Sequence, residues 1–167
     1  MSLLLQSAWA AQSTAVPESV LLDDFESISD WSALPSEGVA LTARTARGRT
    51  EQAMRLDFDF QGRGGYAIAR RALNLDPPEN YEFSFWIRGD ARPNTLEFKL
   101  ADQSGDNVWW YTRPRWKFPR EWTKVTIKRR HIRFAWGPAG GGDLRRAAAL
   151  ELVITAGSGR RRDGLDR

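Results

Sequence analysis

The alternation of apolar and polar residues along short segments is the feature that most constrains the fold of this chain. Between Tyr81 and Arg88 every second residue is apolar: Phe83, Phe85 and Ile87. The intervening positions carry Glu82, Ser84 and Trp86. A period of two places successive side chains on opposite faces of an extended strand, so one face of this segment is expected to enter a core.

The same period recurs along most of the chain. From Thr95 to Leu100 the apolar residues are Leu96, Phe98 and Leu100. A short helix is expected only at Asp143 to Ala149. Turn-forming Gly, Pro, Asp and Asn clusters separate the extended segments. Further strands are expected at 53–60, 66–71, 107–113, 123–128 and 150–155, with a weaker one at 39–44. Roughly seven to nine short strands predict an all-β jelly-roll β-sandwich.

The composition excludes several kinds of site. The chain has no Cys, which excludes disulfides, thiolate metal sites and a cysteine nucleophile. A single histidine, His131, excludes multi-histidine metal sites. Asp57 and Asp59 resemble the carboxylate pair of a glycosidase, but they share one face of one expected strand, with nothing to mark a cleft. Because no nucleophile–base arrangement is evident, the chain is not expected to be an enzyme.

The N-terminus indicates export. Ala8-Trp9-Ala10 fits a small-x-small cleavage site after a short apolar stretch. Residues 1–20 are therefore interpreted as a signal-peptide remnant and leader, with a disordered leader as the alternative, and residues 21–159 as the β-sandwich domain. No run approaches the ~20 apolar residues of a membrane span. The protein is expected to be secreted or periplasmic.

The charge of the chain is modest. The formal net charge is +4, from 25 basic and 21 acidic residues. A basic run from Lys128 to Phe134 is interpreted as the solvated rim of a β segment anchored by Ile127 and Ile132. Nucleic acid would be attracted by such a run, but the limited overall charge does not favour it as a partner.

Four short motifs carry a resemblance to a known family. They are Asp23-Asp24-Phe25-Glu26 with Trp31, the segment 97–102 followed by 107–110, the segment 118–122, and the segment 134–138. In this order they resemble bacterial secreted galactose-binding-like jelly-roll domains of the carbohydrate-binding-module type. Such domains often precede discoidin or glycoside-hydrolase domains. The resemblance covers about Leu22 to Gly159. It implies a non-catalytic module that binds polysaccharide or another glycan, with covalently linked downstream domains.

The C-terminal end departs from that family. The family pattern ends in a Gly-Gly-x-Val-Trp-Ile-Asp strand, whereas residues 160–167 form an aberrant Arg-rich tail. A one-base shift in a permissive choice of codons for 161–167 would encode such a strand. We therefore hypothesise a frameshift or truncation, so that the jelly roll lacks its final strand. A sheet without that strand would expose an edge and part of its core.

The candidate ligand-binding residues are aromatic and charged side chains on expected strands. Aromatic faces stack on the C–H side of a sugar ring, while charged groups hydrogen-bond its hydroxyls. One of two adjacent tryptophans can face outward, and the sequence leaves open which. The alternative is that Trp86 packs in a second core layer and Glu97–Lys99 is a surface pair. Trp31, Trp122 and Trp136 are expected in the core. The candidates are Trp86, Arg88, Glu97, Lys99, Trp109 and Trp110.

The resemblance also implies a metal site. In related jelly rolls, residues of the first and last strands meet at a structural Ca²⁺. Asp24 and Glu26 are the candidate ligands here, with Asp23 beside them, because calcium prefers oxygen ligands. The alternative is an ordinary strand with exposed acidic residues.

Two other functions remain open at this stage. One is a structural spacer or interaction domain that packs against a neighbouring catalytic domain. The other is an intracellular assembly factor, since the mitochondrial complex I intermediate-associated protein has a similar jelly roll. Fold similarity alone does not separate these functions.

Overall fold

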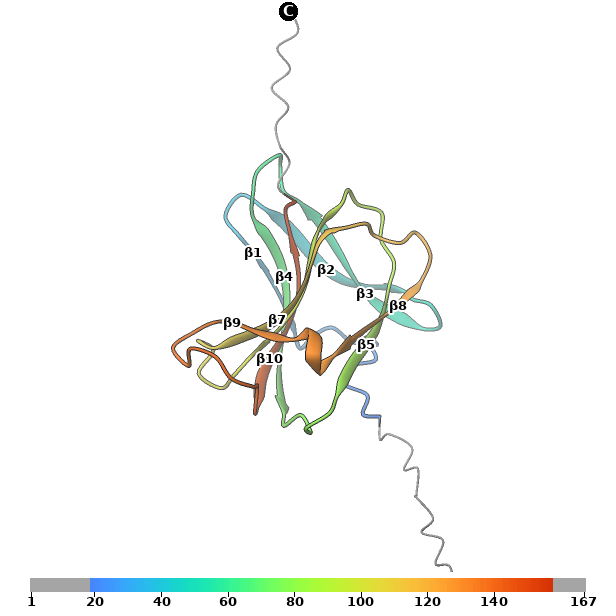
Figure 1. Cartoon of the computed structure of the whole chain (residues 1–167). Helices are drawn as coiled ribbons and strands as arrows, with labels where there is room; N and C mark the ends of the chain where they lie inside the picture. Colours follow the sequence, from blue (N-terminus) through green and yellow to red (C-terminus); the bar gives the residue numbers. More distant parts are fainter. Residues whose placement is uncertain (1–18, 158–167) are drawn as a thin grey trace, which may run out of the picture.

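The computed structural model describes residues 19–157 and is built almost entirely of β-strands (Figure 1). The strands are β1 (Trp31–Pro35), β2 (Ala40–Arg47), β3 (Gln52–Asp59), β4 (Tyr66–Leu75), β5 (Glu82–Ile87), β6 (Asn94–Ala101), β7 (Val108–Trp116), β8 (Thr123–Lys128), β9 (Arg133–Trp136) and β10 (Ala147–Thr155). One 3₁₀ turn, η1 (Arg129–His131), separates β8 from β9. Within these residues no helix has the length and apolarity that a membrane span requires.

The strands form one large sheet and two ribbons. The large sheet has six antiparallel strands in the order β1-β4-β10-β6-β7-β9, and the ribbons are β2-β3 and β5-β8. Figure 1 shows both ribbons on the side of the molecule opposite the large sheet. This two-layer arrangement confirms the expected all-β sandwich.

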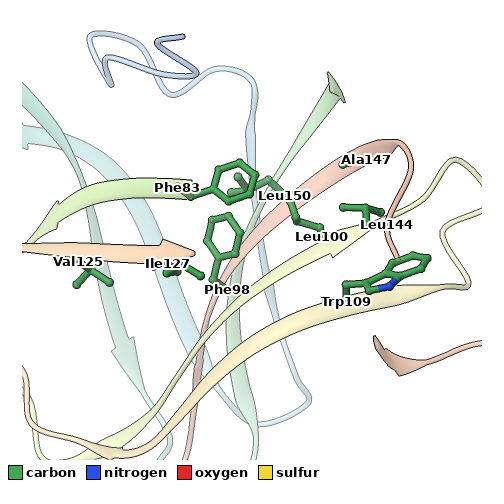
Figure 2. Packing of buried hydrophobic residues seen from close by; sticks show 9 residues of the cluster. All are labelled: Phe83, Phe98, Leu100, Trp109, Val125, Ile127, Leu144, Ala147 and Leu150. Atoms are coloured by element: carbon green, nitrogen blue, oxygen red, sulfur yellow. The ribbon is translucent and has the colours of Figure 1, made fainter. Parts of the chain in front are cut away.

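The core lies between the large sheet and the β5-β8 ribbon (Figure 2). Phe83 of β5 pairs in register with Ile127 of β8, and both point toward the large sheet. Phe98 of β6 meets Phe83 with ring centroids 4.9 Å apart. Leu100 of β6 and Ile127 are fully buried. The apolar face predicted from the period-two pattern of β5 and β6 is therefore the core face, and its burial is the main driving force for folding.

The segment expected to form a helix is instead a loop and the start of β10. Residues 143–146 are irregular, and strand β10 begins at Ala147. Ala149 pairs with Ala72 of β4 on one side and with Ala101 of β6 on the other. The prediction was wrong because a central strand satisfies its backbone on both sides, and this tertiary pairing overrides the helix propensity of alanine.

Two edge strands were not among the expected ones. Strand β1 contains Trp31, whose indole Nε1 donates to Asp23 Oδ2 at 2.8 Å. Arg71 of β4 reaches the same carboxylate oxygen at 2.8 Å. Trp31 is half-buried against the core, as expected. At the other edge, β9 carries Phe134, which packs edge-on against Trp109 with ring centroids 5.4 Å apart.

The expectations for the two ends of the chain lie outside the described residues. The signal-peptide remnant falls largely in 1–18, and the Arg-rich tail falls in 158–167. The hypothesis of a frameshift and a lost final strand therefore stays a prediction.

Candidate functional site

The outer face of the large sheet, turned away from the core, carries a continuous band of charged and aromatic side chains. We call this surface the outer face. Four of its residues are cross-strand neighbours in a row. Arg70 of β4 pairs with Glu151 of β10, Glu151 pairs with Lys99 of β6, and Lys99 pairs with Trp110 of β7. Val153 of β10 also faces outward yet is 0% exposed. Larger side chains around it therefore shield the middle of the face from solvent.

Lys99 lies at the centre of the densest cluster on the outer face. Its Nζ lies 2.9 Å from Glu97 Oε2, and only 12% and 8% of the two side chains are exposed. The same Nζ lies 5.2 Å from the ring centroid of Trp136 and 5.9 Å from that of Trp110. The two indoles meet edge-to-face at 5.6 Å. One ammonium thus holds a carboxylate and two aromatic rings together by charge and cation–π attraction. We call these four residues the Lys99 cluster.

A second ion pair extends the band toward β4. Arg70 Nη1 donates to Glu151 Oε1 at 3.0 Å. Glu151 is also the cross-strand neighbour of Lys99. With strands about 4.8 Å apart, the band from β4 to β9 is roughly 19 Å across, long enough for several sugar rings.

The structure does not bring Trp86 and Arg88 together with the other candidates. Trp86 points outward from β5, which pairs with β8, and Arg88 follows directly after β5, so both lie on the other layer of the sandwich. The guanidinium of Arg49 covers the ring of Trp86 at 4.1 Å, and that of Arg88 covers Trp122 at 5.0 Å. The alternation correctly predicted that these side chains face outward. It could not tell which strands are neighbours.

The structure also separates the two adjacent tryptophans. Trp109 points into the core, where it is 6% exposed and its Nε1 donates to the carbonyl of Gly142 at 2.7 Å. Trp110 points outward into the Lys99 cluster.

Trp122 is half-buried beneath Arg88. Trp136, expected in the core, is 45% exposed and joins the Lys99 cluster instead. It lies on the edge strand β9, beside a shift in the β7–β9 register.

Sequence reasoning missed three outer-face residues: Trp136, Arg70 and Glu151. Arg70 falls on the strand face opposite Ala67 and Ala69, which are both buried, and that alternation could have found it. Glu151 is preceded by Leu150 and followed by Leu152, Val153 and Ile154. Such an apolar run is typical of a strand that is covered on both faces, so the pattern does not show on which face the single charged residue lies.

The loop after Trp136 is fixed by Asn107. The Asn107 side chain donates from Nδ2 to Asp102 Oδ2 at 2.7 Å, while its Oδ1 accepts from the backbone of Ala139 at 2.7 Å. Hydrogen bonds from Ser104, and then from Asn107, hold the pKa of Asp102 below its ordinary value. A Cβ on Gly137 would lie 2.5 Å from Asn107 Oδ1, so only glycine allows this close approach. Asn107, at the turn between β6 and β7, thereby holds the loop that follows Trp136 and positions this tryptophan.

The candidate calcium ligands are engaged with the backbone. Asp24 Oδ1 accepts from the amide of Glu26 at 3.0 Å, and Glu26 Oε1 accepts from the amide of Gln52 at 2.9 Å. Asp23 binds Trp31 and Arg71. Across residues 19–157, no three His, Cys, Asp or Glu side chains gather closely enough to hold a metal ion. The calcium site that the resemblance implies at Asp24 and Glu26 therefore stays a prediction.

The carboxylate pair on β3 is occupied by other groups. Asp57 accepts from Arg55 Nε at 2.8 Å and from Arg44 Nε at 3.2 Å. The hydrogen bond from Arg55 lowers the pKa of Asp57, with a smaller contribution from Arg44. Asp59 accepts from the amide of Gln61 at 2.7 Å. A carboxylate kept ionised in this way is a poor general acid.

The fold matches solved carbohydrate-binding modules, although the sequence matches no protein-family model and no curated protein. A family 11 carbohydrate-binding module from Clostridium thermocellum, solved with a β-1,3-1,4-mixed-linked tetrasaccharide, is 20% identical over 81% of this chain and 87% of that one, with a TM-score of 0.65. The family 11 module of the cellulosomal cellulase Lic26A-Cel5E from the same organism is 19% identical over 85% and 90%, with a TM-score of 0.62.

These likenesses establish the fold. The chain has a jelly-roll fold of the carbohydrate-binding-module type, and the resemblance predicted from the sequence is confirmed at that level.

Proposed function

We propose that this chain is a non-catalytic carbohydrate-binding module of a larger exported protein, and that it binds glycan on its outer face. The observation that carries the proposal is the Lys99 cluster, in which two indoles flank a lysine–glutamate pair on an open sheet surface. The fold likeness supports it, since one similar module was solved with a bound tetrasaccharide.

The chemistry of the outer face suits a sugar. The exposed ring of Trp136 offers an apolar plane for the C–H face of a pyranose. The Arg70–Glu151 pair offers charged donors and acceptors to hydroxyl groups, and charge-assisted hydrogen bonds are the stronger kind. Because the groups lie on paired strands, they are fixed before the ligand arrives, which lowers the entropic cost of binding. No step of bond cleavage is assigned to these residues.

The proposal is tested by affinity electrophoresis and calorimetry on a panel of neutral polysaccharides that begins with mixed-linkage β-glucan. We expect Trp136→Ala to weaken binding roughly two- to twelvefold, because stacking of one aromatic ring is worth about 0.5 to 1.5 kcal/mol. Trp86→Ala is the matched control: it removes the same side chain, with similar exposure, from the other layer of the sandwich.

Three outcomes would contradict parts of the proposal. If Trp86→Ala weakens binding and Trp136→Ala does not, the ligand lies on the β5-β8 ribbon. If both variants weaken binding equally with an unchanged circular dichroism spectrum, the outer face is not the specific site. If a folded protein binds no glycan at all, the spacer or assembly-factor function is favoured instead.

A further inference from the structure

A shallow pocket at the β9 edge of the large sheet concentrates positive charge. It lies where β7 continues beyond the short strand β9 and faces η1 and the end of β8. Three arginines line it, Arg113, Arg130 and Arg133, together with Trp110, Tyr111 and His131. Two threonines complete the wall, and no Asp or Glu is part of it.

The three arginines are not neutralised by the described part of the protein. Between residues 19 and 157, none of them forms a salt bridge. The contrast with Arg129 is direct, because that residue belongs to the same turn as Arg130 and pairs with Asp143. Three guanidinium groups around one hollow, without carboxylates, repel one another and favour an anionic ligand.

Arg113 is held in place by uncharged partners. Its Nη1 donates to the Tyr111 hydroxyl at 2.9 Å, and its guanidinium lies 5.0 Å from the ring centroid of Trp116. Both contacts fix the orientation of the guanidinium while leaving its charge uncompensated. A planar guanidinium presented in this way matches the two oxygens of a carboxylate or sulfate group.

The pocket adjoins the proposed sugar-binding band at the edge of the large sheet. Trp110 lines the pocket and also belongs to the Lys99 cluster, and Arg133 is its cross-strand neighbour. Tyr111 and Arg113 are cross-strand neighbours of the core residues Phe98 and Leu96, so the pocket opens at the edge of the sheet toward the β5-β8 ribbon. A chain of sugars on the outer face would enter it by bending round this edge at Trp110 and Arg133.

We propose that this pocket recognises the carboxylate or sulfate groups of an acidic polysaccharide, so that the module prefers anionic to neutral glycans. The proposal rests on the proposed function, because it assigns a ligand class to a pocket that adjoins the same surface. The observations favour a polysaccharide over a nucleic acid, because the arginines surround one hollow and do not form an extended stripe that could follow a phosphate backbone.

The test measures binding of matched polymers to the whole chain at low and at physiological salt. Polygalacturonate is compared with its fully methyl-esterified form, and dextran sulfate with dextran, so that the members of each pair share a sugar backbone and only one of them carries the anionic groups. We expect at least tenfold tighter binding of one anionic polymer than of its neutral counterpart, with the difference shrinking at higher salt. The pair that responds identifies carboxylate or sulfate as the recognised group.

A triple variant assigns the preference to the pocket. Changing Arg113, Arg130 and Arg133 to Gln should remove the preference and leave any binding of neutral glycan in place. The control removes three positive charges elsewhere, at Arg47, Arg63 and Lys124, and should retain the preference. Equal losses in the two triple variants would show general electrostatic attraction and overturn the inference.

The remaining outcomes separate the two proposals. Neutral glycan bound through Trp136 with no preference for charge would overturn only the pocket inference. Absence of binding to every polymer by a folded protein would overturn both. Single-stranded DNA bound more tightly than any polysaccharide, with loss in the pocket variant, would make the pocket a nucleic-acid site and also overturn the inference.

Discussion

Two tryptophans with nearly equal exposure, Trp86 at 44% and Trp136 at 45%, show how different the two outer surfaces of this sandwich are. Trp86 stands on the β5-β8 ribbon, where the guanidinium of Arg49 covers its ring. Trp136 stands on the large sheet beside a second indole and a nearly buried lysine–glutamate pair. Exposure alone therefore does not mark a binding residue. The neighbours on adjacent strands decide whether an aromatic ring is part of a prearranged site.

The largest loss of stability is expected when the nearly buried ion pair of the outer face, Glu97 with Lys99, is broken. Glu97→Ala leaves the Lys99 ammonium without its carboxylate in a place where water has little access. We expect a loss of about 3 to 5 kcal/mol in the free energy of unfolding, measured by urea denaturation. The double variant Glu97→Leu with Lys99→Leu should recover most of that loss. A loss below about 1 kcal/mol for Glu97→Ala would mean that the pair behaves as a solvated one.

A smaller effect is expected from the residue that positions Trp136. Asn107→Ala removes hydrogen bonds to Asp102 and to the backbone of Ala139, so it should cost about 1 to 3 kcal/mol of stability. It should also weaken glycan binding, although Asn107 is not on the outer face. Binding by calorimetry at a temperature where the variant is fully folded separates the two effects. Unchanged affinity would mean that Trp136 keeps its position without this contact.

The smallest effect is expected on the β5-β8 side. Arg49→Ala uncovers Trp86 and removes one exposed cation–π contact, worth about 0.5 to 1 kcal/mol. Thermal unfolding measures the change, and glycan affinity should stay the same. If Arg49→Ala instead creates or strengthens glycan binding, the covered Trp86 is a second site, and the contrast between the two surfaces is weaker than proposed.

The sequence predicts which side of a strand each side chain faces better than it predicts which strands are neighbours. The period of two in β5 and β6 correctly assigned Phe83 and Phe98 to the core and Trp86 and Lys99 to the exterior. It carried no information on which strands pair, so Trp86 and Lys99 were expected together although they lie on different layers. Strand order is set by contacts between residues far apart in sequence, which local patterns do not contain.

The errors at Trp136 and in the segment 143–149 have the same origin. Trp136 lies beside a Gly-Pro turn, and its surroundings depend on how the short edge strand β9 aligns with β7. The alanines of 147–149 favour a helix locally, but the gap between β4 and β6 accepts only an extended segment. In both places the partner strand decided the outcome.

The place of β10 in the sheet has a consequence for how the protein is made. Strand β10 comes last along the described chain, yet it lies between β4 and β6 and pairs with both. During synthesis, β6, β7 and β9 can associate as soon as they emerge, because they follow one another closely. The pair β1-β4 stays separate from them until residues 147–155 arrive. Until then two sheet edges stand open at once, and the nascent chain passes through a stage that needs protection from association with other copies.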